Sequence, residues 1–319
     1  MSLRLKYYFQ TIRELDIGNQ FFLYGIFFLP SVSLIGILLL FIALIISFRI
    51  SKNNFINDRW NYPFIISIGL IIFGTLNITF LNNPYSYENF NTQIIWFNLL
   101  KWLTLIICFI GFQNFLGTNT QRTLFAKFLI AGTIPVIVSC ILQKLFWNDG
   151  PYQILNGLII WFQKPLYISG GVSGLFSNVN YTGIWIGLSL PYCAVLSRIE
   201  KNKLNKFILF ILIALFSYFI LETNSRNAYL SLIIGLTCLM SLRYSIIFIF
   251  FQISSIILLK FVEISEINFF GINFSLPITR TIADISSSNI NPQDSRFVIF
   301  KEALSLVKDR PFFGWGAST

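Results

Sequence analysis

Long apolar runs separated by short polar connectors make up most of this chain of 319 residues. Each run is close to the ~20 residues that a helix needs to cross the hydrocarbon core of a bilayer, and some are slightly shorter. A series of such runs predicts an all-α, polytopic transmembrane helical bundle. The clear runs are 63–81, 94–116, 123–146, 180–197, 206–221, 227–242 and 244–262.

The first apolar run, 21–48, is long enough for two interpretations and contains Leu29-Pro30-Ser31. One steeply tilted helix would use this length. Two short helices that break at the proline would use it equally well, because Pro donates no backbone hydrogen bond and biases its neighbour away from helix.

Lys and Arg are distributed unevenly among the connectors, and cytoplasmic connectors usually carry the excess. The richer connectors are 49–62, 117–122 and 198–206, together with Arg243. The poorer ones are 82–93, 147–179 and 222–226. The richer set is therefore predicted in the cytoplasm, with the N-terminus, which carries Arg4, Lys6 and Arg13. Both placements require residues 15–48 to cross twice, which predicts nine spans, with eight as the alternative.

This topology divides the chain into a transmembrane bundle, residues 1–262, and an outer-face segment, residues 263–319. Residues 147–179 form a second long outer-face segment, with Trp147 and Trp161 typical of a membrane interface. No small-residue cleavage site follows the first apolar run, so we expect an uncleaved first span.

The amino-acid composition supports a membrane protein and argues against several other classes of protein. Charged residues make up 11% of the chain, against about 25% in soluble proteins. The net charge of +10 lies in the connectors, with no single basic face, so nucleic acid is not an expected partner. The chain has no histidine, and its cysteines lie inside apolar runs without metal spacing. We expect no metal and no cofactor, since phosphate-loop and dinucleotide motifs are also missing.

Arg226 lies in a short polar stretch, 222–227, between two apolar runs. An arginine at a membrane face must snorkel, pair or meet an anionic ligand. It is either a phosphate ligand or part of a plain connector, paired with Glu222 or a lipid headgroup.

Arg296 lies near the start of a predicted helix, 294–309, with Asp294 or Ser295 as its N-cap. An arginine beside the free N–H groups of a helix start suits phosphate, although an interfacial helix with a solvated arginine fits the pattern too. The apolar face of this helix consists of Phe297, Phe300, Leu304 and Val307.

Lys101 lies in the half of run 94–116 nearer the outer face. We hypothesise that Lys101, Arg226 and Arg296 converge on one outer-face cavity that binds a pyrophosphate. The nearby carboxylates Glu222, Asp294 and Glu302 show no paired spacing for acid/base catalysis, so the catalytic residues stay unknown.

Asn178 and Asn180 precede a span that contains Pro191. Their side chains suit a hydrogen bond to a sugar or phosphate, or a helix cap near Tyr181. For Asn180 we favour the cap.

Three stretches together resemble the bacterial O-antigen ligase/polymerase superfamily. They are Gly174-x-Phe176-x-Asn178-x-Asn180, Thr223-x-Ser225-Arg226, and Arg296 followed by a helix and Pro311-x-x-Gly314-Trp315-Gly316. The resemblance covers most of residues 20–316 in span order. It departs at Phe300, where the family usually has Trp.

The resemblance implies a multi-span glycosyltransferase of the bacterial inner membrane. Such enzymes take a glycan from an undecaprenyl-pyrophosphate carrier on the periplasmic face and pass it to an acceptor such as lipid A-core or a second lipid-linked glycan. The two arginines that the family uses for the pyrophosphate correspond to Arg226 and Arg296. The family's catalytic histidine lies beyond the Gly-x-Gly, so we expect a chain truncated at its C-terminus, whose periplasmic loop is incomplete and whose own activity is uncertain.

Two other classes remain open. A membrane transporter is disfavoured by the scarcity of ionisable groups deep in the spans and by the lack of paired broken helices. A non-catalytic subunit of a glycan assembly is the second alternative. The pattern does not distinguish ligase from polymerase, or identify the glycan.

Overall fold

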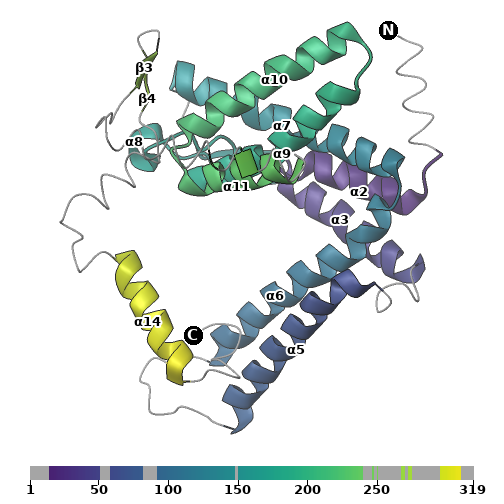
Figure 1. The fold of residues 1–319 in the computed structure, drawn as a ribbon, viewed down its shortest axis with the longest axis vertical. Helices are drawn as coiled ribbons and strands as arrows, with labels where there is room; N and C mark the ends of the chain where they lie inside the picture. Colours follow the sequence, from purple (N-terminus) through teal and green to yellow (C-terminus); the bar gives the residue numbers. More distant parts are fainter. Residues whose placement is uncertain are drawn as a thin grey trace. The chain divides into compact units, whose positions relative to one another are not determined.

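In the computed structural model, residues 14–50, 58–81, 92–147, 150–239, 246–247, 250, 267–269, 272–274 and 295–309 are described. Most of them are helical (Figure 1). Their contacts divide the chain into a first unit, Met1–Ala43 with Thr118–Ser288, and a second unit, Leu44–Gly117 with Asn289–Thr319. The domain boundary predicted between residues 262 and 263 lies outside the described residues.

Helix α9 is at the centre of the first unit and packs against α7, α10 and α11, while α2 packs against α7 (Figure 1). The apolar core between these helices includes Val136, Ile186, Phe216 and Phe219, which are all buried. The bounds are α2 Ile17–Phe28, α7 Asn119–Phe146, α9 Val179–Ile199, α10 Lys203–Glu222 and α11 Arg226–Leu239.

Small residues allow α9 and α11 to approach closely. A Cβ atom on Gly183 of α9 would lie 2.5 Å from the Cβ of Ala228 and 2.9 Å from the Oγ1 of Thr223. One turn later, a Cβ on Gly187 would collide with the hydroxyl of Ser231. Close approach through glycine, alanine and serine is typical of helix pairs in membranes, where packing drives association.

The predicted break at Leu29-Pro30-Ser31 is confirmed, since α2 ends at Phe28 and α3 (Ser33–Ile50) begins after it. The described length of α2 is 12 residues. At about 1.5 Å per residue this helix is about 18 Å long, short of the ~30 Å hydrocarbon core. The described part of α2 therefore does not span the core by itself.

The second unit contains α5 (Tyr62–Leu76), continued by the π-helical η2 (Asn77–Leu81), and α6 (Thr92–Phe112), continued by η3 (Gln113–Leu116). The short η1 (Arg59–Asn61) and α14 (Ser295–Asp309) also belong to it. Polar side chains join its segments: the Ser47 hydroxyl donates to the Gly111 carbonyl at 2.6 Å, and Gln113 donates to the Asn61 side chain at 2.9 Å.

Six helices are long and apolar enough to cross a membrane, judged over the described residues. Five match predicted runs, and the sixth, α3, lies at the end of run 21–48. These helices expose many large apolar side chains, which fits a membrane protein. Nine spans are not confirmed: the described part of α11 has 14 residues, and run 244–262 is described at residues 246, 247 and 250 alone. The orientation of the termini also remains a prediction.

The described residues are mostly helical, as predicted, and they also include two short hairpins. Strand β1 (Tyr152–Ile154) pairs with β2 (Ile159–Trp161), and β3 (Ile267–Phe269) pairs with β4 (Ile272–Phe274), both antiparallel. The sequence signal for the first hairpin is Asn156-Gly157 between apolar residues, because that dipeptide readily adopts the positive φ angles of a tight hairpin turn.

Polar contacts of the first unit lie at both ends of its bundle, and one buried group, Thr133, Trp185 and Ser189, lies midway along α7 and α9. At one end the Gln121 amide donates to the Asn19 side chain at 3.1 Å and joins the starts of α7 and α2. Glu200, just after α9, lies near Lys127 of α7 at this same end. At the other end the last turn of α7, the start of α9 and the turn between α10 and α11 meet. The candidate site lies at that second end.

Candidate functional site

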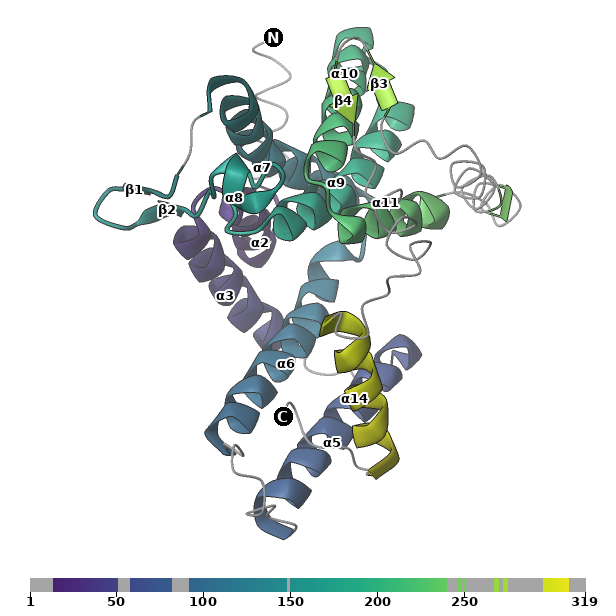
Figure 2. The same ribbon diagram turned by 90° about the vertical axis from the view of Figure 1, so that its left-hand side faces the viewer.

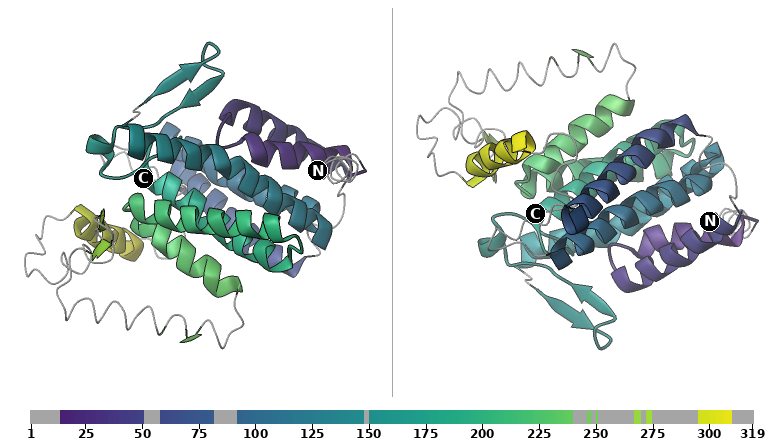
Figure 3. Two further views of the ribbon diagram at one scale, coloured as in Figure 1. Left: turned by 90° about the horizontal axis from the view of Figure 1, so that it is seen from above. Right: turned by 90° about the horizontal axis from the view of Figure 1, so that it is seen from below.

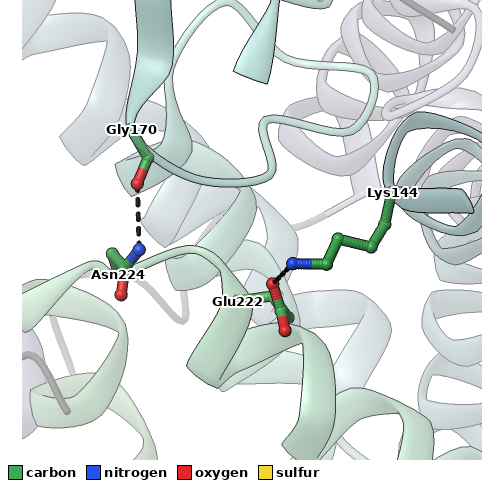
Figure 4. A network of polar contacts seen from close by, with 4 residues as sticks. All are labelled: Lys144, Gly170, Glu222 and Asn224. Atoms are coloured by element: carbon green, nitrogen blue, oxygen red, sulfur yellow. Dashed lines mark hydrogen bonds and ion pairs between the residues drawn. The ribbon is translucent and has the colours of Figure 1, made fainter. Parts of the chain in front are cut away.

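Two loops far apart in sequence form a polar cluster at this end, which we define as Gln143, Lys144, residues 163–178 and Glu222–Arg226. The Val172 amide donates to the Glu222 carbonyl at 3.0 Å. The Asn224 side chain donates to the Gly170 carbonyl at 2.9 Å (Figure 4). Between these bonds, a Cβ on Gly171 would lie 2.6 Å from the Thr223 carbonyl oxygen, so only glycine fits without a backbone shift.

The side chain of Gln143, on α7, is fully buried and makes hydrogen bonds to the loop of residues 163–178. Its side-chain oxygen accepts the amides of Ser173 and Gly174 at 3.0 and 3.1 Å. Its side-chain nitrogen donates to the Lys164 carbonyl at 2.6 Å. One side chain thus satisfies three backbone groups, and the buried amides of Ser173 and Gly174 would be costly to leave unpaired.

Lys144, the next residue, makes an ion pair across the cluster. Its Nζ lies 2.7 Å from a carboxylate oxygen of Glu222, at the end of α10 (Figure 4). The same carboxylate accepts a hydrogen bond from Tyr218, one turn earlier. Glu222 therefore connects α7 to the turn that carries Arg226, and pairs with Lys144, a partner that the sequence did not suggest.

Ser225 connects the starts of α9 and α11. Its hydroxyl donates to the Asn180 side chain at 2.7 Å and also accepts the Ala228 amide at 3.3 Å. The second bond is the usual N-cap contact for a helix that begins at Arg226. One hydroxyl thus caps α11 and joins it to the first turn of α9.

The cap of α9 is Asn178, which corrects the prediction for Asn180. The Asn178 side chain accepts the Asn180 amide at 2.8 Å, and α9 begins at Val179. Helix α9 starts about two residues earlier than hydropathy suggested, because the cap depends on a short polar side chain and not on where apolar residues begin. Asn180 lies inside the first turn, and its side-chain oxygen accepts from Ser225.

Arg226 is exposed as the first residue of α11. The caps at Asn178 and Ser225 already accept the Asn180 and Ala228 amides, but the helix dipole is positive at both helix starts. The starts of α9 and α11 are joined, so two positive helix ends and one guanidinium occur together. Such an arrangement is suited to an anion with several oxygens.

The two other predicted cations belong to the second unit, so their convergence with Arg226 remains a prediction. Lys101 is exposed on α6, where its Nζ donates to Asn98 at 3.0 Å and lies 5.6 Å from the ring centre of Phe97. Arg296 is the second residue of α14, and this helix confirms the one predicted at 294–309.

The described residues offer few candidates for a general base. Glu222 forms an ion pair with Lys144 and accepts a hydrogen bond from Tyr218. Glu302 is exposed on α14 of the second unit. Asp294 lies outside the described residues. Across the described part of the chain, no cluster of three or more His, Cys, Asp or Glu residues could hold a metal ion.

Sequence reasoning missed Gln143, Lys144 and Asn224 as members of the cluster. Gln143 and Lys144 lie in the last turn of an apolar helix, and their partners are at least 20 residues away. A possible signal was the Gln-Lys pair interrupting an apolar run, since buried polar groups need partners.

No protein-family model, curated protein or solved structure matches this chain. The geometry of the fold and of the polar cluster is therefore the structural basis for any functional proposal.

Proposed function

We propose that this chain is a membrane glycosyltransferase of the O-antigen ligase/polymerase type. In this proposal it takes a glycan from an undecaprenyl-pyrophosphate carrier at the periplasmic face of the bacterial inner membrane and passes it to an acceptor, lipid A-core or a second lipid-linked glycan. One observation supports it most. Two stretches that carry the resemblance, 174–180 and 223–226, are joined by the bond from Ser225 to Asn180, beside the exposed Arg226.

The chemistry explains why an arginine at paired helix starts fits this reaction. The acceptor hydroxyl oxygen forms a bond to the anomeric carbon and releases its proton to water or to the departing pyrophosphate, and the bond from that carbon to the carrier pyrophosphate breaks. The electron pair leaves with the pyrophosphate, whose charge must be stabilised. A guanidinium offers planar, bidentate donors to phosphate oxygens, and the positive ends of the two helix dipoles add to this stabilisation without a metal.

The charge distribution of the first unit supports the proposed orientation. The connector with Arg198, Lys201 and Lys203 lies at the end of α9 opposite the polar cluster. The positive-inside rule assigns that connector to the cytoplasm and the polar cluster to the periplasm. Lipid-linked glycans destined for surface polymers would then meet the site on the correct side.

Transfer of a labelled glycan in membrane vesicles tests the proposal. Vesicles containing the whole protein, a lipid-linked glycan donor and the acceptor should produce glycosylated acceptor. Arg226→Gln and Arg296→Gln should abolish transfer, and Arg226→Lys should retain part of it, because lysine keeps the charge without the fork. Arg198→Gln, an exposed cation at the other end of α9, is the matched control and should retain full activity. Unchanged transfer by Arg226→Gln would rule out this donor site.

A further inference from the structure

The β1–β2 hairpin has one entirely apolar and aromatic face. Tyr152 is paired with Trp161, and Ile154 with Ile159. Residues directly opposite each other in an antiparallel pair point to the same face, so these four side chains share one side of the ribbon. The other side carries the pair Gln153 and Ile160.

The tip of the hairpin extends this apolar surface. Asn156 and Gly157 have φ angles of 52° and 90°, and the Leu158 amide donates to the Leu155 carbonyl at 3.1 Å, which closes the turn. Leu155 and Leu158 flank this turn and are 67% and 41% exposed. Leu155 itself has a φ of 54°, a conformation that leucine rarely adopts.

Water is a poor environment for such a ribbon. No charged residue occurs between Gly150 and Gln163. A two-stranded hairpin with strands of three residues is at best marginally stable in water, and its exposed apolar side chains add a hydration cost of about 25 cal/mol per Å².

The hairpin comes soon after the end of a candidate span that exposes large apolar side chains. Helix α7 ends in Leu145 and Phe146, followed by Trp147, all of them exposed, and β1 begins five residues later. Tryptophan and tyrosine concentrate where the hydrocarbon core meets the headgroups. The apolar hairpin thus follows, within a few residues, a helix end that exposes apolar side chains.

Two hydrogen bonds hold the base of the hairpin against the rest of the first unit. The Trp161 indole donates to the Ser31 carbonyl, between α2 and α3, at 3.0 Å. The Phe162 amide donates to the Leu175 carbonyl at 3.1 Å. Beyond this base the hairpin extends away from the helices, as Figures 2 and 3 both show.

We propose that the β1–β2 hairpin and the end of α7 are a membrane-interface anchor, whose partner is the headgroup and upper acyl region of the lipid bilayer. Leu155 and Leu158 insert among the acyl chains and Tyr152 lies at headgroup level, while Trp161 packs against the core of the first unit. The proposal is independent of the glycosyltransferase function. It gives the polar cluster, which is bonded to the hairpin through Leu175 and Phe162, a fixed depth relative to the lipid.

Collision measurements on a spin label test this proposal. p-Acetylphenylalanine replaces Leu155 or Leu158 and receives a nitroxide, so that the native cysteines stay in place. Both side chains are exposed, so the label displaces no packed neighbour. The protein is reconstituted in vesicles of phosphatidylethanolamine and phosphatidylglycerol. Oxygen, which concentrates in hydrocarbon, and a nickel chelate, which concentrates in water, serve as the two collision partners.

Two reference positions calibrate the result: Leu188, exposed in the middle of α9, for lipid, and Lys201, exposed in the connector after α9, for water. We expect an oxygen-to-nickel collision ratio at positions 155 and 158 well above that at 201 and close to that at 188. A ratio equal to that at 201 would place the tip in water and overturn the proposal. Low collision rates with both partners would also overturn it, in favour of a protein or a second copy covering the hairpin.

Discussion

The ion pair between Lys144 and Glu222 has unequal partners, since their side chains are 39% and 10% exposed. Without Lys144, the largely buried Glu222 carboxylate would lose its ion-pair partner. Without the Glu222 charge, Lys144 could still be hydrated. An uncompensated buried charge costs more than a hydrated one, so the two positions should differ in sensitivity.

Lys144→Met is therefore expected to lower the free energy of unfolding by about 1–3 kcal/mol, and Glu222→Gln by less. The double variant should be more stable than Lys144→Met alone, because it no longer contains the stranded carboxylate. Unfolding of the four proteins in the same detergent measures this cycle. Equal and additive costs would show that the pair does not connect α7 to the turn before α11.

Glu200 gives the opposite end of the bundle a pH dependence. Its carboxylate accepts the Asn202 amide at 2.9 Å, and this bond, helped by nearby Asn205 and Lys127, holds the pKa of Glu200 below its usual value. A lowered pKa stabilises the folded state above the unfolded pKa of about 4.3, and that contribution is lost as the pH falls through the folded pKa. Glu200→Gln should thus melt below the parent protein at pH 7, and the difference should vanish in acid. A difference that persists at low pH would contradict this.

At the scale of elements, the contact between α9 and α11 controls the geometry of the polar cluster. Gly183 lies one turn after Asn180 and leaves no room for a side chain against Ala228 and Thr223. If the two helices separated, the bond from Ser225 to Asn180 would lengthen. The close helix contact and the polar link therefore depend on each other.

Gly183→Ala tests this dependence, with Gly69→Ala as the matched control. A Cβ on Gly69 of α5 would meet nothing within 4 Å. In the control, alanine should stabilise the helix by about 0.5–1 kcal/mol, because it restricts the unfolded chain. At position 183 the same change should destabilise by about 1–3 kcal/mol through overpacking. The free energies of unfolding of both variants in detergent measure this difference. Stabilisation by Gly183→Ala would contradict the close packing of α9 against α11.

The helices of this chain could be predicted well from the sequence. The residues at which they begin and end could be predicted less well. Hydropathy identified α5, α6, α7, α9 and α10 because burial in lipid requires long apolar runs. It placed the start of α9 near Tyr181, whereas the Asn178 cap starts it at Val179. The β1–β2 hairpin was missed, although Asn156-Gly157 signals its turn, since its strands are as apolar as the helices around them.

At the scale of the whole molecule, the contacts that build the candidate site are not visible in the sequence. The bond from Ser225 to Asn180 joins residues 45 positions apart, and the Lys144–Glu222 pair joins residues 78 positions apart. Each is a tertiary contact between helix ends. From the sequence, Arg226 was either a phosphate ligand or part of a plain connector, because a charge at a membrane face needs a partner, and the family resemblance implied the first. Convergence of Arg226 with Lys101 and Arg296 stays a prediction.

Direct binding of the carrier headgroup tests the proposed donor site most sharply. The protein in lipid nanodiscs is titrated with undecaprenyl pyrophosphate and, separately, with undecaprenyl phosphate. We predict tighter binding of the pyrophosphate, and an affinity reduced about tenfold or more in Arg226→Gln, since a charge-assisted hydrogen bond contributes about 1.5–3 kcal/mol. Arg198→Gln should bind like the parent. Equal affinity of the parent protein and Arg226→Gln, or no preference for the pyrophosphate, would contradict the proposal.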